Sequence, residues 1–289
     1  MKYEGTVYRP PSEAYSLIIQ VTIGCAHNKC SFCGMYKDKK FRIRTNDEIF
    51  RDLEEARKYH SLVKRIFLAD GDALVLPTNT LKNILIKIKE LYPECERVGV
   101  YGAPKDILNK SVHELKELKE LGLGILYLGI ESGSDNILKN INKGVNSQEM
   151  IEAGKKVKES GIKLSATLIS GIGSKDGMLE HARESARVIN HIDPDYVGLL
   201  TLMVERGTEI YNLVSSGSFE LLSPEEVMLE TKEFIKELKV SNCVFRSNHA
   251  SNYMSLGGVL PEDKERLLLQ LEKAINGQCS FKNERFRGL

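Results

Sequence analysis

The stretch Gly24-Cys25-Ala26-His27-Asn28-Lys29-Cys30-Ser31-Phe32-Cys33-Gly34-Met35-Tyr36 places three cysteines within nine residues. It directly follows an apolar run, residues 15–21, whose composition is typical of a β-strand. Three thiolates can bind three irons of a [4Fe–4S] cluster. Because no fourth cysteine lies nearby in the sequence, one iron would stay open to a non-protein ligand. An open iron favours chemistry over simple electron storage.

The same loop permits a second kind of metal site. Three sulfurs and the imidazole of His27 would suit a tetrahedral structural zinc. Such a zinc usually stabilises a fold that is too small to be stable alone, which a chain of 289 residues does not need. The pattern therefore favours the iron–sulfur cluster, and the alternative is a zinc-binding or iron–sulfur electron-transfer protein without catalytic activity.

The composition indicates the compartment in which the protein works and the classes of partner that its charge does not attract. With 41 basic and 40 acidic residues the net charge is +1, so no global field recruits nucleic acid or an anionic membrane. Six cysteines, three of them clustered, do not resemble a secreted disulfide framework. The N-terminal residues lack a leader pattern, and no apolar run approaches about 18 residues. We therefore expect a cytoplasmic protein without a membrane partner.

Strand-like and helix-like segments alternate along the chain. The strand-like runs are residues 15–22, 65–69, 97–101, 124–130, 162–169 and 195–203, with a seventh candidate at 242–246. Capping boxes at Thr45/Glu48 and Ser111/Glu114 open two of the intervening helices. This alternation predicts an α/β fold with parallel strands in a single domain, either a (β/α) barrel or an open doubly wound sheet. In both architectures, chemistry gathers at the carboxyl ends of the strands.

Three polar features follow strands in this pattern. The cysteine loop follows the first strand, Asp70-Gly71-Asp72 follows the second, and Glu131-Ser132-Gly133 follows the fourth. We expect them to converge at one end of the sheet.

With these features, the chain resembles the radical S-adenosylmethionine (SAM) superfamily. Its cluster loop follows the first strand and usually has an aromatic residue before the last cysteine, as Phe32 is here. The commonest spacing in that family has three residues between the first two cysteines, whereas this chain has four. The resemblance implies a partial (β/α)6-type barrel spanning residues 1–289, with its core at about 15–205 and a C-terminal extension at about 206–289.

The resemblance also implies where SAM binds. Asp70, Gly71 and Asp72 match the Gly-Gly-Glu-like motif that meets the methionyl ammonium, a group with three donors and no acceptor. Without the resemblance, an ordinary Asp-Gly turn would explain these residues.

Two further segments match positions that contact the nucleoside in this family. Glu131, with Ser132, corresponds to the ribose contact at the end of the fourth strand. Ile169 and Gly171 match the Ile-x-Gly pattern that packs against adenine, and Leu200 on the next strand would add apolar contact. Ordinary core strands and a strand-end helix cap are the structural alternatives.

The activity implied by the resemblance is reductive cleavage of SAM. The open iron would chelate SAM, and one-electron reduction would release methionine and a 5′-deoxyadenosyl radical, which abstracts hydrogen from a substrate. This describes an oxidoreductase or transferase whose partners are a small-molecule substrate and a low-potential reductant such as flavodoxin or ferredoxin.

The substrate itself stays open. Arg246, His249 and Tyr253 form a dense polar set after a strand-like run, so they are the candidate substrate residues, with a polar loop as the structural alternative. The helical and Glu-Ser-Gly segments are similar to the oxygen-independent coproporphyrinogen oxidase-like branch, but the cysteine spacing argues against assigning its porphyrin substrate. RNA is a minor alternative, suggested by a local basic run that comprises Lys37, Lys39, Lys40, Arg42 and Arg44.

Overall fold

The computed structural model describes residues 3–288. Its strands are β1 (Leu17–Gln20), β2 (Thr22–Ile23), β3 (Arg42–Ile43), β4 (Arg65–Ala69), β5 (Arg97–Tyr101), β6 (Leu123–Glu131), β7 (Lys163–Ser170), β8 (Tyr196–Thr201), β9 (Cys243–Ser247) and β10 (Leu256–Leu260). Its α-helices are α1 (Asn46–Arg57), α2 (Thr78–Leu91), α3 (Pro104–Leu108), α4 (Val112–Glu120), α5 (Asp135–Asn140), α6 (Ser147–Ser160), α7 (Met178–Ile192), α8 (Glu209–Ser215), α9 (Pro224–Glu237) and α10 (Lys264–Ile275). Two 3₁₀ turns, η1 (Pro11–Glu13) and η2 (Glu284–Phe286), complete the elements.

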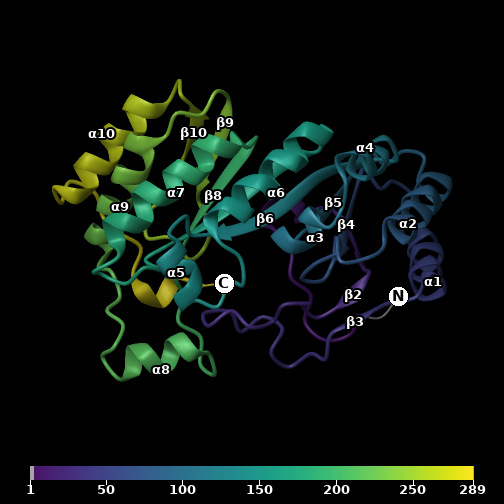
Figure 1. Cartoon of the computed structure of the whole chain (residues 1–289), viewed down its shortest axis with the longest axis horizontal. Helices are drawn as coiled ribbons and strands as arrows, with labels where there is room; N and C mark the ends of the chain where they lie inside the picture. Colours follow the sequence, from purple (N-terminus) through teal and green to yellow (C-terminus); the bar gives the residue numbers. More distant parts are fainter. Residues whose placement is uncertain (1–2, 289) are drawn as a thin grey trace. The chain divides into compact units, whose positions relative to one another are not determined.

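Eight strands form one mostly parallel sheet in the order β1-β4-β5-β6-β7-β8-β9-β10 (Figure 1). The pairs β1/β4, β4/β5, β5/β6, β7/β8 and β8/β9 are parallel, and β9/β10 is antiparallel. β2 and β3 pair separately. The predicted α/β fold with parallel strands is confirmed, and the sheet is open, with β1 and β10 at its edges.

All seven strand-like runs are strands, whereas β10 was not expected from the sequence. Gly257 and Gly258 occupy its centre and give it a weak strand signal, because glycine is unfavourable inside strands. It is held instead by antiparallel pairing with β9.

Local capping explains where several helices begin. Thr45, Ser111 and Ser223 each accept a hydrogen bond from the backbone N–H of the glutamate three residues later, and the carboxylate of that glutamate accepts one from the backbone N–H of the cap residue. These reciprocal bonds satisfy donors that a helix start leaves unpaired. Gly161, with φ of +78°, directly follows α6 and ends it.

Contacts divide the chain into two compact units. The first comprises Met1–Asn28, Met35–Leu128 and Ala153–Leu164. In it α2 packs against both α1 and α4, and the rings of Phe67, Tyr101 and Tyr127 meet edge to face with centroids 5.0–6.1 Å apart.

The second unit comprises Lys29–Gly34, Gly129–Glu152 and Ser165–Leu289. In it α9 packs between α7 and α10, as Figure 1 shows. A single domain over residues 1–289 stays a prediction.

Candidate active site

The loop that carries Cys25 is joined by its backbone to the turn after β4. Gly24, with φ of +79°, donates its N–H to Asp70 Oδ2 over 2.9 Å. In return the Gly71 N–H donates to the Gly24 carbonyl over 3.2 Å. Because glycine adopts positive φ without a side-chain clash, the backbone at position 24 can turn so that both its N–H and its carbonyl face residues 70 and 71. The two segments predicted to meet at the strand ends do meet in the first unit.

Asp70 is fully buried, and its two carboxylate oxygens accept hydrogen bonds from other groups of the protein. Besides the Gly24 N–H, the carboxylate accepts hydrogen bonds from Gln20 Nε2 at 3.2 and 3.3 Å. Lys39 Nζ lies 2.9 Å from Asp70 Oδ2, and its side chain is only 4 % exposed. A buried carboxylate needs such partners to remain charged. Asp70 thus positions the cysteine loop, a role that the sequence pattern did not reveal.

Gly71 has a steric reason to be glycine. A Cβ at this position would lie 2.8 Å from Cys25 Cβ and 3.0 Å from the Tyr36 ring. Both separations are well inside van der Waals contact. The absence of a side chain at position 71 therefore lets Cys25 approach the end of β4.

Asp72 points into the first unit and is 1 % exposed. Its Oδ1 accepts the Leu74 N–H over 3.1 Å, while Oδ2 is buried without a hydrogen-bond partner. Burial, followed by the neighbouring Asp106 carboxyl, raises the pKa of Asp72 well above its usual range. A cation at Oδ2 would lower that pKa again by favouring the carboxylate.

The segment with Cys30 and Cys33 belongs to the second unit and is held by two helix ends. Ser31 donates its N–H to the Ile141 carbonyl, just after α5, and its carbonyl accepts the Ile210 N–H of α8, both at 3.0 Å. Gly34 lies against Glu205, so that a Cβ there would be 2.1 Å from Glu205 Oε2. Backbone bonds and this close approach define the path of the chain around Cys33, and Phe32 is half-buried beside it.

The turn after β6 contains the predicted ribose contacts. Glu131 has φ of +64°, and its carboxylate pairs with Lys143 Nζ at 2.9 Å. Ser132 is fully buried, and its Oγ lies 2.9 Å from His181 Nδ1. Glu131 therefore forms a largely buried ion pair, while Ser132 faces inward. Positive φ at a non-glycine residue is strained, a feature often found at functional sites.

The predicted adenine contacts are neighbours in the sheet. Ile169 of β7 is paired with Leu200 of β8, and both are partly exposed. The adjacent pair, Leu168 and Leu199, is buried on the opposite face. Gly171 follows β7 with φ of +80°. The strand alternation thus leaves one partly open apolar face beside the Gly171 turn.

The candidate substrate residues lie in β9 and the loop after it, and each already contacts the protein. Arg246 is exposed and donates to the Phe245 and Gly258 carbonyls. His249 Nδ1 lies 2.9 Å from Ser251 Oγ, and burial, then Lys282, lowers its pKa. Tyr253 donates to Glu284 and lies under the Arg287 guanidinium, and burial raises its pKa to about 12.

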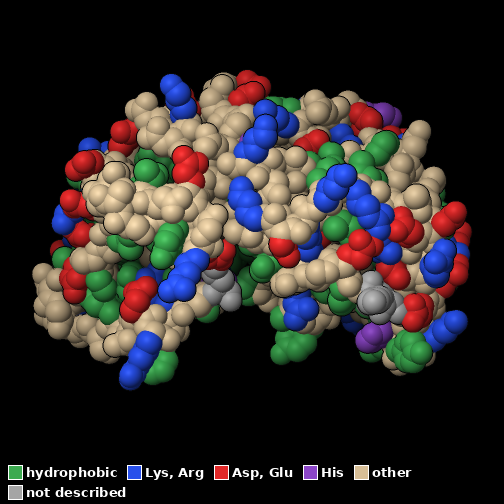
Figure 2. All heavy atoms as spheres, turned by 90° about the horizontal axis from the view of Figure 1, so that it is seen from below, with side chains coloured by type: hydrophobic (Ala, Val, Ile, Leu, Met, Phe, Trp, Pro, Cys, Tyr) green, Lys and Arg blue, Asp and Glu red, His purple; other side chains and the backbone are tan. Residues whose placement is uncertain are grey.

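The basic run near the cysteine loop is largely paired with acids. Arg42 contacts Glu4 and Glu48, Arg44 pairs with Asp52 at 2.7 Å, and Lys39 pairs with Asp70. Figure 2 likewise shows acidic and basic side chains interspersed over one face of the molecule. The run therefore offers fewer unpaired charges to RNA phosphates than the sequence suggested.

Comparison with known proteins identifies the family. The Radical SAM superfamily matches residues 19–186, which is more than half of the chain. This chain belongs to the radical SAM superfamily.

Its similarity to individual members is distant. The heme chaperone HemW of Bacillus subtilis (strain 168) is 24% identical and aligns over 73% of this chain and 56% of its own length. An uncharacterized methyltransferase of Pyrococcus horikoshii is also 24% identical, over 90% of this chain and 56% of its own. The chain thus spans little more than half of these two relatives.

Solved structures of other proteins show the same fold. Methylornithine synthase superposes with a TM-score of 0.54 at 16% identity, covering 89% of this chain and 68% of that one. Coproporphyrinogen III oxidase from Escherichia coli gives a TM-score of 0.56 at 16% identity, covering 77% and 52%. At these identities the likeness concerns the fold alone.

Radical SAM proteins bind a [4Fe–4S] cluster and SAM, and the donors present here suit both. Cys25, Cys30 and Cys33 are half-buried thiols, which is the donor type that such clusters take. Across residues 3–288, no three His, Cys, Asp or Glu side chains already stand in metal-ligand geometry, so the fit rests on donor type and spacing. The unpartnered Oδ2 of Asp72 suits an ammonium donor. Within the same range, no helix is long and apolar enough to cross a bilayer.

Sequence reasoning missed two buried polar residues that lie behind the turns after β6 and β7. His181 lies on α7 and Glu230 on α9, each 2 % exposed. The sequence did indicate burial of Glu230, because this residue interrupts a helical apolar stripe that includes Val227 and Phe234.

Proposed function

We propose that this chain is a radical SAM enzyme whose [4Fe–4S] cluster is held by Cys25, Cys30 and Cys33. One observation supports this proposal above all. Within the segment that matches the family, the Gly24 N–H donates to Asp70, and Cys25 packs closely against Gly71. When bound and reduced, the cluster supplies an electron that cleaves SAM to methionine and a 5′-deoxyadenosyl radical, which removes hydrogen from the substrate.

In this proposal the carboxyl ends of the strands bind SAM. Asp72 Oδ2 accepts from the methionyl ammonium, with Asp70 and Gly71 supporting the turn. Glu131 and Ser132 contact the ribose. Adenine packs on the open apolar face, whose residues are Ile169, Gly171 and Leu200. Phe32 shields the cluster.

The substrate side of the proposal rests on β9 and its following loop. Arg246 is the candidate for binding an anionic group of a small molecule, and His249 and Tyr253 for hydrogen bonding or proton transfer. Their present partners, such as Glu284 and Arg287 at Tyr253, would have to yield to a substrate. A flavodoxin or ferredoxin in the cytoplasm would supply the electron.

The test is anaerobic reconstitution followed by reduction with dithionite. We expect 5′-deoxyadenosine to form from SAM with the unmutated chain and not with Cys33→Ala. About four irons and four sulfides per chain accompany this result. One zinc and no sulfide would instead support the structural metal site. A full cluster without SAM binding or cleavage would support an electron-transfer protein.

A heme chaperone is the second candidate, because the HemW relative aligns with 73% of this chain. A chaperone would bind heme tightly and need not turn over SAM. Titration with hemin, followed by its Soret absorption, separates the two: saturable one-to-one binding without 5′-deoxyadenosine formation would favour the chaperone.

A further inference from the structure

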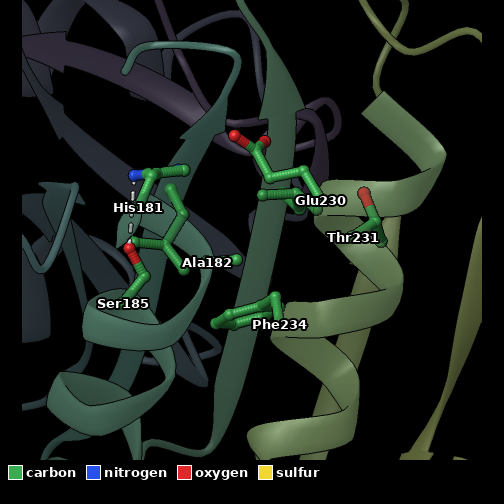
Figure 3. Close-up of a pocket in the computed structure, with 8 residues that line it drawn as sticks. His181, Ala182, Ser185, Glu230, Thr231 and Phe234 are labelled. Atoms are coloured by element: carbon green, nitrogen blue, oxygen red, sulfur yellow. Dashed lines mark hydrogen bonds between the residues drawn. The ribbon is translucent and has the colours of Figure 1, made fainter. Parts of the chain in front are cut away.

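Two buried polar side chains lie behind the turns that follow β6 and β7. Figure 3 shows His181 on α7 and Glu230 on α9 at the edge of one cavity, which is also lined by Leu168, Leu199 and Phe234. The cavity measures about 10 Å³ and could hold at most about one water molecule. It is too small for a substrate, so the two polar groups need another explanation.

His181 connects α7 to the Ser132 turn. Its Nδ1 lies 2.9 Å from Ser132 Oγ, and its ring also interacts with the Ile169 backbone. Next to it on the helix, Ser185 Oγ accepts the Gly133 N–H over 2.9 Å. Burial lowers the pKa of His181 to about 4, so the ring is neutral at pH 7 and one of its nitrogens is an acceptor. α7 thus holds the Ser132–Gly133 turn through two side chains.

Glu230 holds the turn after β7 in a similar way. Its Oε2 accepts both the Ser170 hydroxyl and the Gly171 N–H, the latter over 2.9 Å. Its Oε1 is buried without a hydrogen-bond partner. Burial raises the pKa of Glu230 to about 8. A single oxygen therefore fixes the backbone at Gly171, the residue with φ of +80°.

We propose that His181 and Glu230 are positioning residues that hold the Ser132 and Gly171 turns in the geometry that binds the nucleoside of SAM. This inference rests on the proposed function. Neither side chain would touch SAM: each acts through hydrogen bonds to a turn that does.

The physical basis is the cost of unpaired buried groups. Replacing Glu230 with an apolar residue would leave the Gly171 N–H and the Ser170 hydroxyl without their acceptor, and the turn would relax toward other acceptors or water. Small displacements of a binding turn weaken ligand contacts even when the fold survives. The effect should therefore appear in nucleoside binding while the cysteine loop keeps its cluster.

The test compares an apolar and an isosteric variant at each position in the cluster-loaded protein. Glu230→Leu removes the acceptor, whereas Glu230→Gln keeps an amide oxygen for Ser170 and Gly171. His181→Leu and His181→Asn form the matching pair. Phe234→Leu is the control, because it alters the same cavity and the phenyl ring of Phe234 makes no side-chain hydrogen bond to either turn. Equilibrium dialysis gives the Kd for SAM, and deuterium exchange reports on the amides of residues 131–134 and 169–173.

We expect the SAM Kd to rise about tenfold in Glu230→Leu and in His181→Leu, with unchanged iron content and faster exchange in the turn concerned. The Gln and Asn variants should stay close to the unmutated value. Phe234→Leu should lose thermal stability but not SAM affinity. Equal SAM affinity in all cluster-loaded proteins would overturn the inference while leaving the proposed function intact.

Failure of SAM binding in the unmutated protein would instead count against the proposed function. If Glu230→Leu does not fold, Ser170→Ala removes one of the two bonds and leaves the buried carboxyl in place. Its SAM Kd should then rise about threefold, and an unchanged Kd would overturn the role of Glu230.

Discussion

At the residue scale, the approach of Gly71 to Cys25 shows how one missing side chain shapes the cysteine loop. Gly71 also donates its N–H to Gly24, and Asp70 accepts from the same residue, so the two turns hold one another. The Asp-Gly pattern alone is compatible with any tight turn. Its role becomes specific because Cys25 Cβ occupies the space that a side chain at position 71 would need.

Gly71→Ala should therefore weaken the cysteine loop. The added methyl group would lie 2.8 Å from Cys25 Cβ, and such overpacking costs about 1–3 kcal/mol. We expect a lower Tm and less iron bound per chain, measured by thermal unfolding and iron analysis after reconstitution. Gly288→Ala, which adds a methyl group with no atom within 4 Å, is the control. Equal iron content in both variants would show that the loop absorbs the clash.

At the element scale, one arginine makes several of the contacts that attach the segment after α10 to the chain that follows β8 and β9. Arg287 donates to the Leu202 carbonyl at 3.0 Å and the Ser251 carbonyl at 2.6 Å, and it lies 4.0 Å from the Tyr253 ring centroid. Lys282 adds a backbone bond to Tyr253. These contacts place the segment over the loop that contains the candidate substrate residues.

Arg287→Ala should release this segment. Loss of the buried guanidinium removes its bonds to two separate carbonyls, so amide exchange over residues 278–288 should accelerate by about tenfold or more. Deuterium exchange with peptide-level mass spectrometry measures this. Arg285→Ala is the matched control, since that guanidinium lies over Phe286 within the same segment. Similar exchange in the two variants would show that Lys282 and Glu284 suffice to hold it.

At the scale of the whole molecule, buried ionisable groups link stability to pH. His181 has a pKa of about 4 in the folded chain, below its ordinary value of about 6.5. As the pH falls below 6.5, the unfolded chain takes up a proton that the folded chain refuses, so the free energy of unfolding decreases. Glu230, with its raised pKa, acts in the opposite sense as the pH rises toward 8.

His181→Asn should remove the decrease in unfolding free energy that His181 causes at acidic pH. Between pH 7.5 and 5 the His181 contribution amounts to about 2 kcal/mol, so the unmutated chain should lose that much more unfolding free energy than the variant. Urea unfolding at both pH values measures it, and Glu230 cancels because both proteins contain it. Equal losses of unfolding free energy in the two proteins would mean that folding does not lower the pKa of His181, so that its ring is protonated in the folded chain at pH 5.

Periodicity, capping boxes and ligand spacing are local patterns, so the amino-acid sequence alone predicts seven of the strands, the capped helices and the cysteine loop. It also indicated which strand ends carry polar residues. Three features emerge only in the folded chain: Asp70 pairs with Lys39, Gly71 makes room for Cys25, and Glu230 holds the turn after β7. Such partners are 31 to 60 residues apart, and their burial and pairing depend on packing that no local pattern encodes.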